Sequence, residues 1–207
     1  MELKEFDKAL QNWKKAISVN PNNAQAYNNI GNVLMEINNE RSAIKHYQKA
    51  ILVNENFILA HFNLGNAFQK VNLLDESINS YNKAIELNIK FAEAYYNRAN
   101  SYRDKNSLKK ALNDYNEAYK LNPALKDLFG NIISTKNYLC DWKNYNEDIK
   151  YIEKKILNGS NIVNPFSILA LIDSPSLHQI NIKNFIKSEQ INESDNYNFF
   201  LKNKVNS

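Results

Sequence analysis

The chain repeats itself every 34 residues over much of its length, and this period restricts the fold more than any other feature of the sequence. Aromatic residues, alanines and asparagines return at this spacing. The clearest columns are Trp13, Tyr47, Tyr81 and Tyr115; Ala16, Ala50, Ala84 and Ala118; and Asn20, Asn54, Asn88 and Asn122. Units of this size bury their apolar faces only against neighbouring units, so they stack. We therefore predict an all-α solenoid with one helical hairpin per repeat.

Each repeat contains two segments with the apolar spacing of an amphipathic helix. In the first complete repeat these segments cover residues 23–37 and 40–53. The pattern recurs over residues 57–71 and 74–87, then 91–105 and 108–121, and a lone second helix is expected over 2–19. The turns inside the hairpins carry Asn38, Asn72 and Asn106. Asn is the usual substitute for Gly in the left-handed conformation that ends many helices, so we expect that conformation at these residues.

The columns resemble the tetratricopeptide repeat, a resemblance carried by Tyr27, Ile30, Gly31, Leu34, Ala43, Tyr47 and Ala50, with Pro21 and Pro123 in two copies. Glu55 and Ile89 stand where the pattern prefers Pro, and Arg98 occupies an apolar column. The resemblance implies a right-handed superhelix whose first helices line a concave groove that holds extended peptides. We expect this solenoid to span residues 1–157, made of a half repeat 1–21, full repeats 24–57, 58–91 and 92–125, and a degenerate repeat 126–157.

Beyond Pro123 the repeat pattern weakens, although helical periodicity continues. We expect a helix over 125–138 and a second one within 139–156, where an apolar stripe runs from Trp142 to Ile156. Residues 158–190 are expected to form a helical junction segment, with a helix that begins at Pro175 and ends near Lys187. The polar composition of residues 191–207 predicts a flexible tail.

Two columns of asparagine lie on the first helices, outside their apolar stripe. They contain Asn29, Asn63, Asn97 and Asn131 in one column and Asn32, Asn66 and Asn100 in the other, one helical turn further along. An amide side chain offers a donor and an acceptor, so it can bind the backbone of a peptide whatever side chains that peptide carries. We predict that these residues bind extended protein or peptide segments. The chain contains 37 Asn, so compositional bias is the alternative explanation for both columns.

Other groove and site chemistries find little support in the sequence. Repeats that clamp the terminal carboxylates of chaperone tails use Lys and Arg beside two Asn, but the columns with Asn28, Asn63, Glu93 and Asn97 lack these bases. The three His have no ligand-like spacing to one another or to Cys140, so we expect no metal site. Four Gly cannot form a phosphate-binding loop here. We therefore expect no catalytic residues and no cofactor, with Cys140 a packed residue.

The runs LCDWKNY at 139–145 and PFSILALIDSP at 165–175 resemble the junction of bacterial O-linked N-acetylglucosamine transferases, between their repeat arm and their glycosyltransferase domain. That family has an asparagine-lined groove that recruits acceptor proteins. The resemblance implies a peptide-binding arm without the catalytic lobes. One alternative is a fragment of a longer protein O-GlcNAc transferase that uses UDP-N-acetylglucosamine. Another alternative is an assembly scaffold without a groove ligand, with self-association through a solenoid end.

Charge and hydropathy add only exclusions. The formal net charge is +4, without a block of like charges, so no nucleic-acid partner is predicted. The longest apolar stretch, residues 166–172, is far shorter than the roughly 20 residues that a bilayer requires, so no membrane partner is expected. One Cys cannot form an internal disulfide, and the first residues do not resemble a secretory signal. We therefore expect a cytoplasmic protein.

Overall fold

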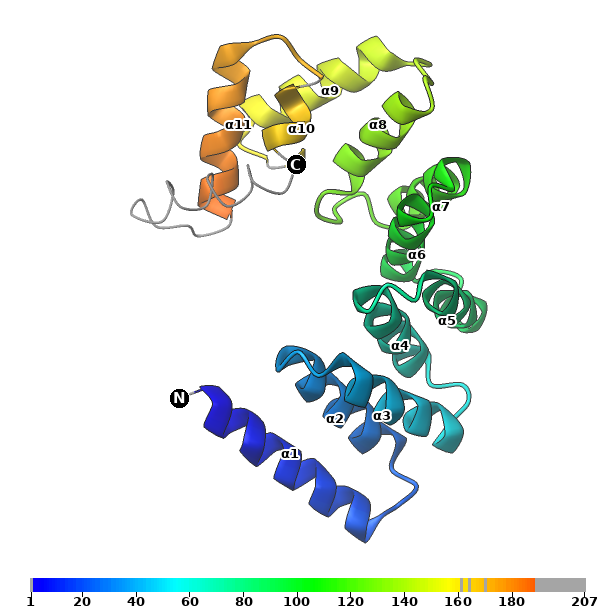
Figure 1. The fold of residues 1–207 in the computed structure, drawn as a ribbon. Coiled ribbons are helices and arrows are strands. Elements are labelled where there is room, and N and C mark those ends of the chain that lie inside the picture. The colour runs from blue at the N-terminus through cyan, green and yellow to red at the C-terminus, as the bar shows by residue number, and fades with distance from the viewer. Residues whose placement is uncertain (1, 161, 164, 170, 189–207) are drawn as a thin grey trace. The chain divides into compact units, whose positions relative to one another are not determined.

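The computed structural model describes residues 2–160, 162–163, 165–169 and 171–188, and in these ranges the chain is helical (Figure 1). It forms two compact units, which we call unit 1 (Met1–Asn122) and unit 2 (Pro123–Ser207). Unit 1 contains α1 (Glu2–Val19), α2 (Ala24–Glu36), α3 (Glu40–Val53), α4 (Ile58–Lys70), α5 (Leu74–Leu87), α6 (Ala92–Asp104) and α7 (Leu108–Leu121). These bounds lie within a residue or two of those predicted from the sequence.

Unit 1 is an α-solenoid of three hairpins preceded by one unpaired helix (Figure 1). The hairpins pair α2 with α3, α4 with α5 and α6 with α7, and each hairpin packs on the next one along the chain. Contacts also join α2 to α4 and α4 to α6, so the first helices of successive repeats are neighbours. Small residues make this packing possible. A Cβ atom added to Gly65 would lie 2.5 Å from the ring of Tyr81, and Gly31 meets the ring of Tyr47 in the same way.

The predicted left-handed turns are confirmed at Asn38, Asn72 and Asn106, with φ of 54°, 59° and 56°. Cys140, which is 34 residues after Asn106, occupies the same kind of position with φ of 53° and is exposed. The prediction that Cys140 is packed was therefore wrong. Its place in the repeat is that of the turn residue, which lies at the helix end and outside the core.

The turn at Asn72 gives a testable prediction of stability. Most L residues lose about 1–2 kcal/mol in the left-handed region, because Cβ approaches the following carbonyl oxygen. Asn72→Val should therefore lower the free energy of unfolding by about that amount, whereas Asn72→Gly should leave it unchanged or raise it. Urea denaturation followed by circular dichroism measures both variants, and equal stability of Val and Gly would contradict the explanation.

Unit 2 contains α8 (Leu128–Tyr138), α9 (Tyr145–Leu157), α10 (Pro165–Leu169) and α11 (Pro175–Ser188). Its core includes Ile133 of α8, Ile152 and Ile156 of α9, and Ile168 of α10. The helix expected over 125–138 begins only at Leu128, because the chain turns at Asp127 with φ of 59°. Trp142 precedes α9 and is exposed, so it was wrongly included in the apolar stripe.

The limits of the units differ from the expected division into solenoid, junction and tail. The boundary after Asn122 separates residues 126–157 from the three complete repeats, and these residues share a core with α10. The short helix α10 was not anticipated as a separate element. The expected tail over 191–207 lies outside the described residues. The division into domains at 157 and 190 stays a prediction.

Candidate functional site

The candidate site is the face that α2, α4 and α6 share in unit 1. These first helices contact one another across the repeats in addition to their own hairpin partners. The asparagine columns lie on them, in the middle of each helix. Any ligand that extends along the repeats on this face would meet the same column positions once per repeat.

Hydrogen bonds between asparagines cross from each first helix to the next. The Nδ2 of Asn63 on α4 donates to Oδ1 of Asn32 on α2 at 3.1 Å. One repeat later, Nδ2 of Asn97 on α6 donates to Oδ1 of Asn66 on α4 at 2.8 Å. Each bond therefore joins a residue of one predicted column to a residue of the other, and we call the two bonded pairs, Asn32 with Asn63 and Asn66 with Asn97, the asparagine chain.

A buried tyrosine from the second helix of each repeat supports the column that contains Asn32. The hydroxyl of Tyr81 donates to Oδ1 of Asn66 at 2.7 Å. The equivalent bonds run from Tyr47 to Asn32 at 2.9 Å and from Tyr115 to Asn100 at 2.6 Å. Burial raises the pKa of all three hydroxyls well above the usual range, so they stay protonated donors at physiological pH.

Sequence reasoning assigned these tyrosines to packing and missed their hydrogen bonds. A signal was present, because each tyrosine follows its asparagine by the same 15 residues. Asn28 was also missed as a member of the network. It is buried, and its Oδ1 accepts from Nδ2 of Asn63 at 3.0 Å. The corresponding residues of the next repeats are Phe62 and Tyr96, so no column revealed it.

Asn29 and Asn131, two of the predicted site residues, differ from Asn63 and Asn97 in their hydrogen bonds or in their position in the fold. The Oδ1 of Asn29 accepts from Nε2 of Gln25 at 2.8 Å, a bond within α2 that does not lead to the next repeat. Asn131 lies in α8 of unit 2, where its carbonyl oxygen accepts from the hydroxyl of Thr135. Within unit 1, hydrogen bonds join Asn63 to Asn32 and Asn97 to Asn66, and Asn100 accepts from Tyr115.

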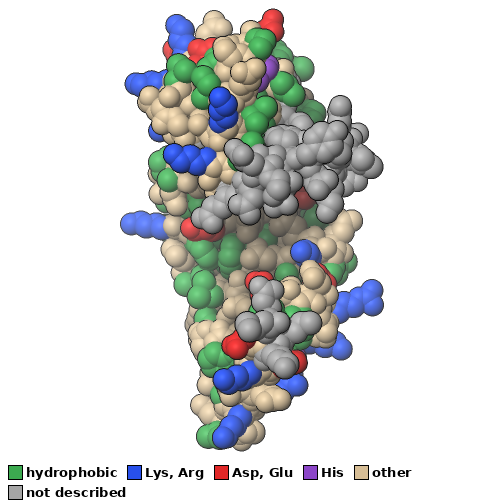
Figure 2. Space-filling model, turned by 90° about the vertical axis from the view of Figure 1, so that its left-hand side faces the viewer, with side chains coloured by type: hydrophobic (Ala, Val, Ile, Leu, Met, Phe, Trp, Pro, Cys, Tyr) green, Lys and Arg blue, Asp and Glu red, His purple; other side chains and the backbone are tan. Residues whose placement is uncertain are grey.

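The surface offers few other candidates for chemistry. On the face visible in Figure 2, neither basic nor acidic side chains form a continuous patch. Within the described ranges, no group of three or more His, Cys, Asp or Glu residues could hold a metal ion. No helix among the described residues is long and apolar enough to cross a bilayer.

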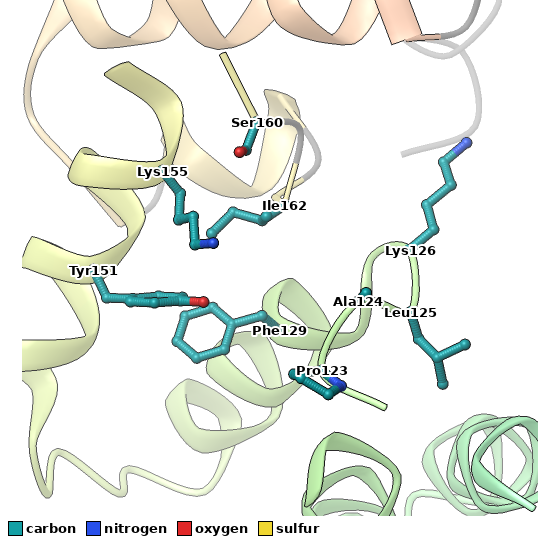
Figure 3. A pocket seen from close by; sticks show the side chains of 9 residues that line it. All are labelled: Pro123, Ala124, Leu125, Lys126, Phe129, Tyr151, Lys155, Ser160 and Ile162. Carbon is teal, nitrogen blue, oxygen red and sulfur yellow. The ribbon is translucent and has the colours of Figure 1, made fainter. Parts of the chain in front are cut away.

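Unit 2 has a cavity of about 370 Å³ beside α8 and α9 (Figure 3). The rings of Phe129 and Tyr151 meet there with centroids 4.8 Å apart, and the ammonium group of Lys155 lies 5.5 Å from the Tyr151 centroid. Pro123 and Ile162 add apolar walls. Ser160 and Lys126 add polar side chains to the lining.

Comparison with known families identifies the repeat. A family model described as TPR repeat matches residues 1–38 and 72–102, and a model described as tetratricopeptide repeat matches 24–57 and 92–125. Together these matches span more than half of the chain. The chain belongs to the tetratricopeptide-repeat family. The second region that the tetratricopeptide repeat model matches ends at residue 125, close to the boundary between unit 1 and unit 2.

Solved tetratricopeptide-repeat structures share the fold. A crystal structure of MamA is 23% identical, with a TM-score of 0.67 over 74% of this chain and 92% of that chain. MamA from Desulfovibrio magneticus RS-1 is 17% identical, with a TM-score of 0.65 over 70% and 82%. The first TPR of Spaghetti (RPAP3), bound to the HSP90 peptide SRMEEVD, is 20% identical with a TM-score of 0.56 over 56% and 93%. No curated protein sequence matches the chain.

Proposed function

We propose that unit 1 is a protein-interaction module that binds extended protein segments along the face of α2, α4 and α6. The asparagine chain is the observation that carries this proposal. Its internal bonds use only part of the capacity of the amides, and the remaining groups are not buried. A repeated row of open amide groups suits the backbone of a peptide, since backbone groups also repeat along the chain. The HSP90 peptide bound to a structural neighbour supports this class of ligand.

The double variant Asn63→Ala with Asn97→Ala tests the proposal. Each hydrogen bond to a peptide contributes about 0.5–1.5 kcal/mol net, so two lost bonds should weaken binding roughly 5- to 100-fold. Fluorescence anisotropy with several unrelated, unstructured peptides should give a similar factor for each, because backbone recognition does not depend on side chains. One single variant should have only a small effect.

A matched control is available on the second helices. Asn79 on α5 and Asn113 on α7 are also 34 residues apart and are exposed. The variant Asn79→Ala with Asn113→Ala should bind peptides like the unchanged protein. Unchanged peptide affinity of the Asn63→Ala, Asn97→Ala variant would refute groove binding. A stable complex or self-association that survives this double change would instead favour the assembly scaffold.

A more specific proposal is that the groove recruits acceptor segments as the repeat arm of an O-linked N-acetylglucosamine transferase does. Its support is the resemblance of residues 139–145 and 165–175 to the junction of that family. In unit 2 these two runs are in contact, because the hydroxyl of Tyr145 donates to the carbonyl oxygen of Leu171 at 3.0 Å. A hybrid transferase in which this chain replaces the natural repeat arm tests the proposal, with UDP-N-acetylglucosamine as donor. If the hybrid enzyme no longer glycosylates its acceptor proteins, this specific role is rejected.

A further inference from the structure

The cavity of unit 2 combines an aromatic wall with positive charge. Its volume of about 370 Å³ lies in the range of small-molecule sites, about 300–1,000 Å³. Phe129 of α8 and Tyr151 of α9 form the aromatic wall, with ring centroids 4.8 Å apart and ring planes at 57°. The described residues that line the cavity include two lysines and no aspartate or glutamate. Their side chains therefore suit a ligand that is apolar over most of its surface and negatively charged at one end.

Lys155 brings its ammonium group to the aromatic wall. Tyr151 lies one turn earlier on α9, and Nζ of Lys155 is 5.5 Å from the centroid of the Tyr151 ring. The Lys155 side chain is half-buried, whereas its neighbour Lys154 is exposed. Lys136 in the same unit pairs with Asp148 at 2.7 Å, but no carboxylate in the described part of the chain pairs with Lys155. The charge of Lys155 is therefore available to an anion in the cavity.

The hydroxyl groups of Tyr151 and Ser160 also line the cavity. Among the described residues, neither hydroxyl has a hydrogen-bond partner, whereas the hydroxyl of Tyr145 on the same helix donates to the carbonyl oxygen of Leu171. In Figure 3, the hydroxyl of Tyr151 and the ammonium group of Lys155 both point away from α9, toward Phe129 and Ile162. The cavity thus has donors that the protein itself does not use.

The 34-residue period shows that packing in the manner of the complete repeats does not require these two side chains. Tyr151 falls in a column of charged residues, and Lys155 falls in a column of aliphatic residues. The charged column contains Lys49, Lys83 and Glu117, and the aliphatic column contains Val53, Leu87 and Leu121. In unit 2 an aromatic ring therefore replaces a charge, and a charge replaces an aliphatic side chain. This exchange creates the aromatic wall with a cation beside it.

We propose that unit 2 binds a small aromatic carboxylate in this cavity. The carboxylate accepts from Nζ of Lys155 and from the hydroxyl of Tyr151, and the aromatic ring of the ligand packs against Phe129 and Ile162. One ammonium group balances one negative charge, whereas a phosphate dianion would leave a charge uncompensated among apolar walls. Lys126 does not supply a second charge there, since its side chain extends away from the two rings in Figure 3.

This proposal goes beyond the proposed function, because the site lies in unit 2 and uses none of the residues on α2, α4 and α6. Peptide affinity and carboxylate affinity are measured separately, so either proposal can fail while the other stands.

Titration of the whole chain, labelled with nitrogen-15, with phenylacetate tests the choice of ligand. Amide signals of Phe129, Tyr151 and Lys155 should shift, and phenylacetate should bind at least about tenfold more tightly than its neutral analogue phenylacetamide, because hydrogen bonds to a charged group are the stronger ones. No shifts at these residues, or equal affinity for the two compounds, would overturn the proposal. Tighter binding of phenyl phosphate than of phenylacetate would overturn the assignment of a carboxylate.

The variant Lys155→Met tests the role of the ammonium group, since it keeps a long side chain and removes the charge. We expect affinity for phenylacetate to fall about tenfold and affinity for phenylacetamide to stay unchanged. Lys154→Met is the matched control, because it removes the same charge from an exposed neighbour, and it should bind phenylacetate like the unchanged protein. An equal loss in both variants would indicate general attraction to a basic helix end, and no loss in Lys155→Met would show that Lys155 does not hold the ligand. Either result overturns the proposal.

Discussion

Replacing Asp114 with Ala is expected to lower the free energy of unfolding of unit 1 by about 3–5 kcal/mol, because it leaves the Arg98 guanidinium buried without its counter-ion. Arg98 donates to both carboxylate oxygens of Asp114, from Nε at 2.6 Å and from Nη2 at 2.8 Å. The side chains are only 17% and 10% exposed. Burial alone would lower the pKa of Arg98, but the hydrogen bonds and charge of Asp114 outweigh it and raise the pKa.

The repeat supplies a matched control for this pair. One repeat earlier, Leu64 occupies the position of Arg98 and Ser80 that of Asp114. The double variant Arg98→Leu with Asp114→Ser copies that arrangement and leaves no buried charge, so it should stay within about 1.5 kcal/mol of the unchanged protein. Urea denaturation followed by circular dichroism compares the two variants. A single Asp114→Ala variant as stable as the unchanged protein would show that water, rather than Asp114, satisfies Arg98.

Arg98 also shows where the period of the sequence is a poor guide. At an apolar column an arginine counts as a departure from the pattern, and no 34-residue comparison explains it. Its explanation is a partner 16 residues away, on the other helix of the same hairpin, together with Nη1 donation to Asn82 at 2.6 Å. Periodicity reports which positions face the core, but it does not report which side chains meet there.

The asparagine columns show the same division between what sequence predicts and what it leaves out. Period and helical spacing placed Asn63 and Asn97 on one face, and the structure joins each to the preceding repeat. The constant offset to the tyrosines was visible, yet only the short distances show that hydroxyls hold the amide oxygens. In unit 2 the period fades, and α10 begins at Pro165 and contains only five residues, too few for any apolar periodicity to predict it.

Truncation of Tyr81 to Ala is expected to lower the free energy of unfolding by about 3–5 kcal/mol, because the ring is fully buried and leaves a cavity. The ring packs on Gly65 and lies 5.9 Å from the ring of Phe62 between centroids. Gly65 has no side chain with which to fill the space. Thermal unfolding measured by calorimetry tests this value, and a loss below about 1 kcal/mol would mean that neighbouring helices collapse into the gap.

The conservative variant Tyr81→Phe separates the hydroxyl from the ring. It keeps the packing on Gly65 and removes the bonds of the hydroxyl to Oδ1 of Asn66, at 2.7 Å, and to Oε1 of Gln69, at 3.2 Å. One O–H proton is shared between these two acceptors, so we expect a loss of about 0.5–1.5 kcal/mol in stability. The second effect concerns binding. Asn66 keeps one internal partner, Asn97, so its amide can rotate and no longer presents a fixed donor. Peptide affinity should therefore fall by about the factor expected for the loss of one hydrogen bond between the Asn66 amide and the peptide backbone. Tyr27→Phe, on α2, is the control, since no hydrogen bond joins the Tyr27 hydroxyl to a described asparagine, and it should leave affinity unchanged.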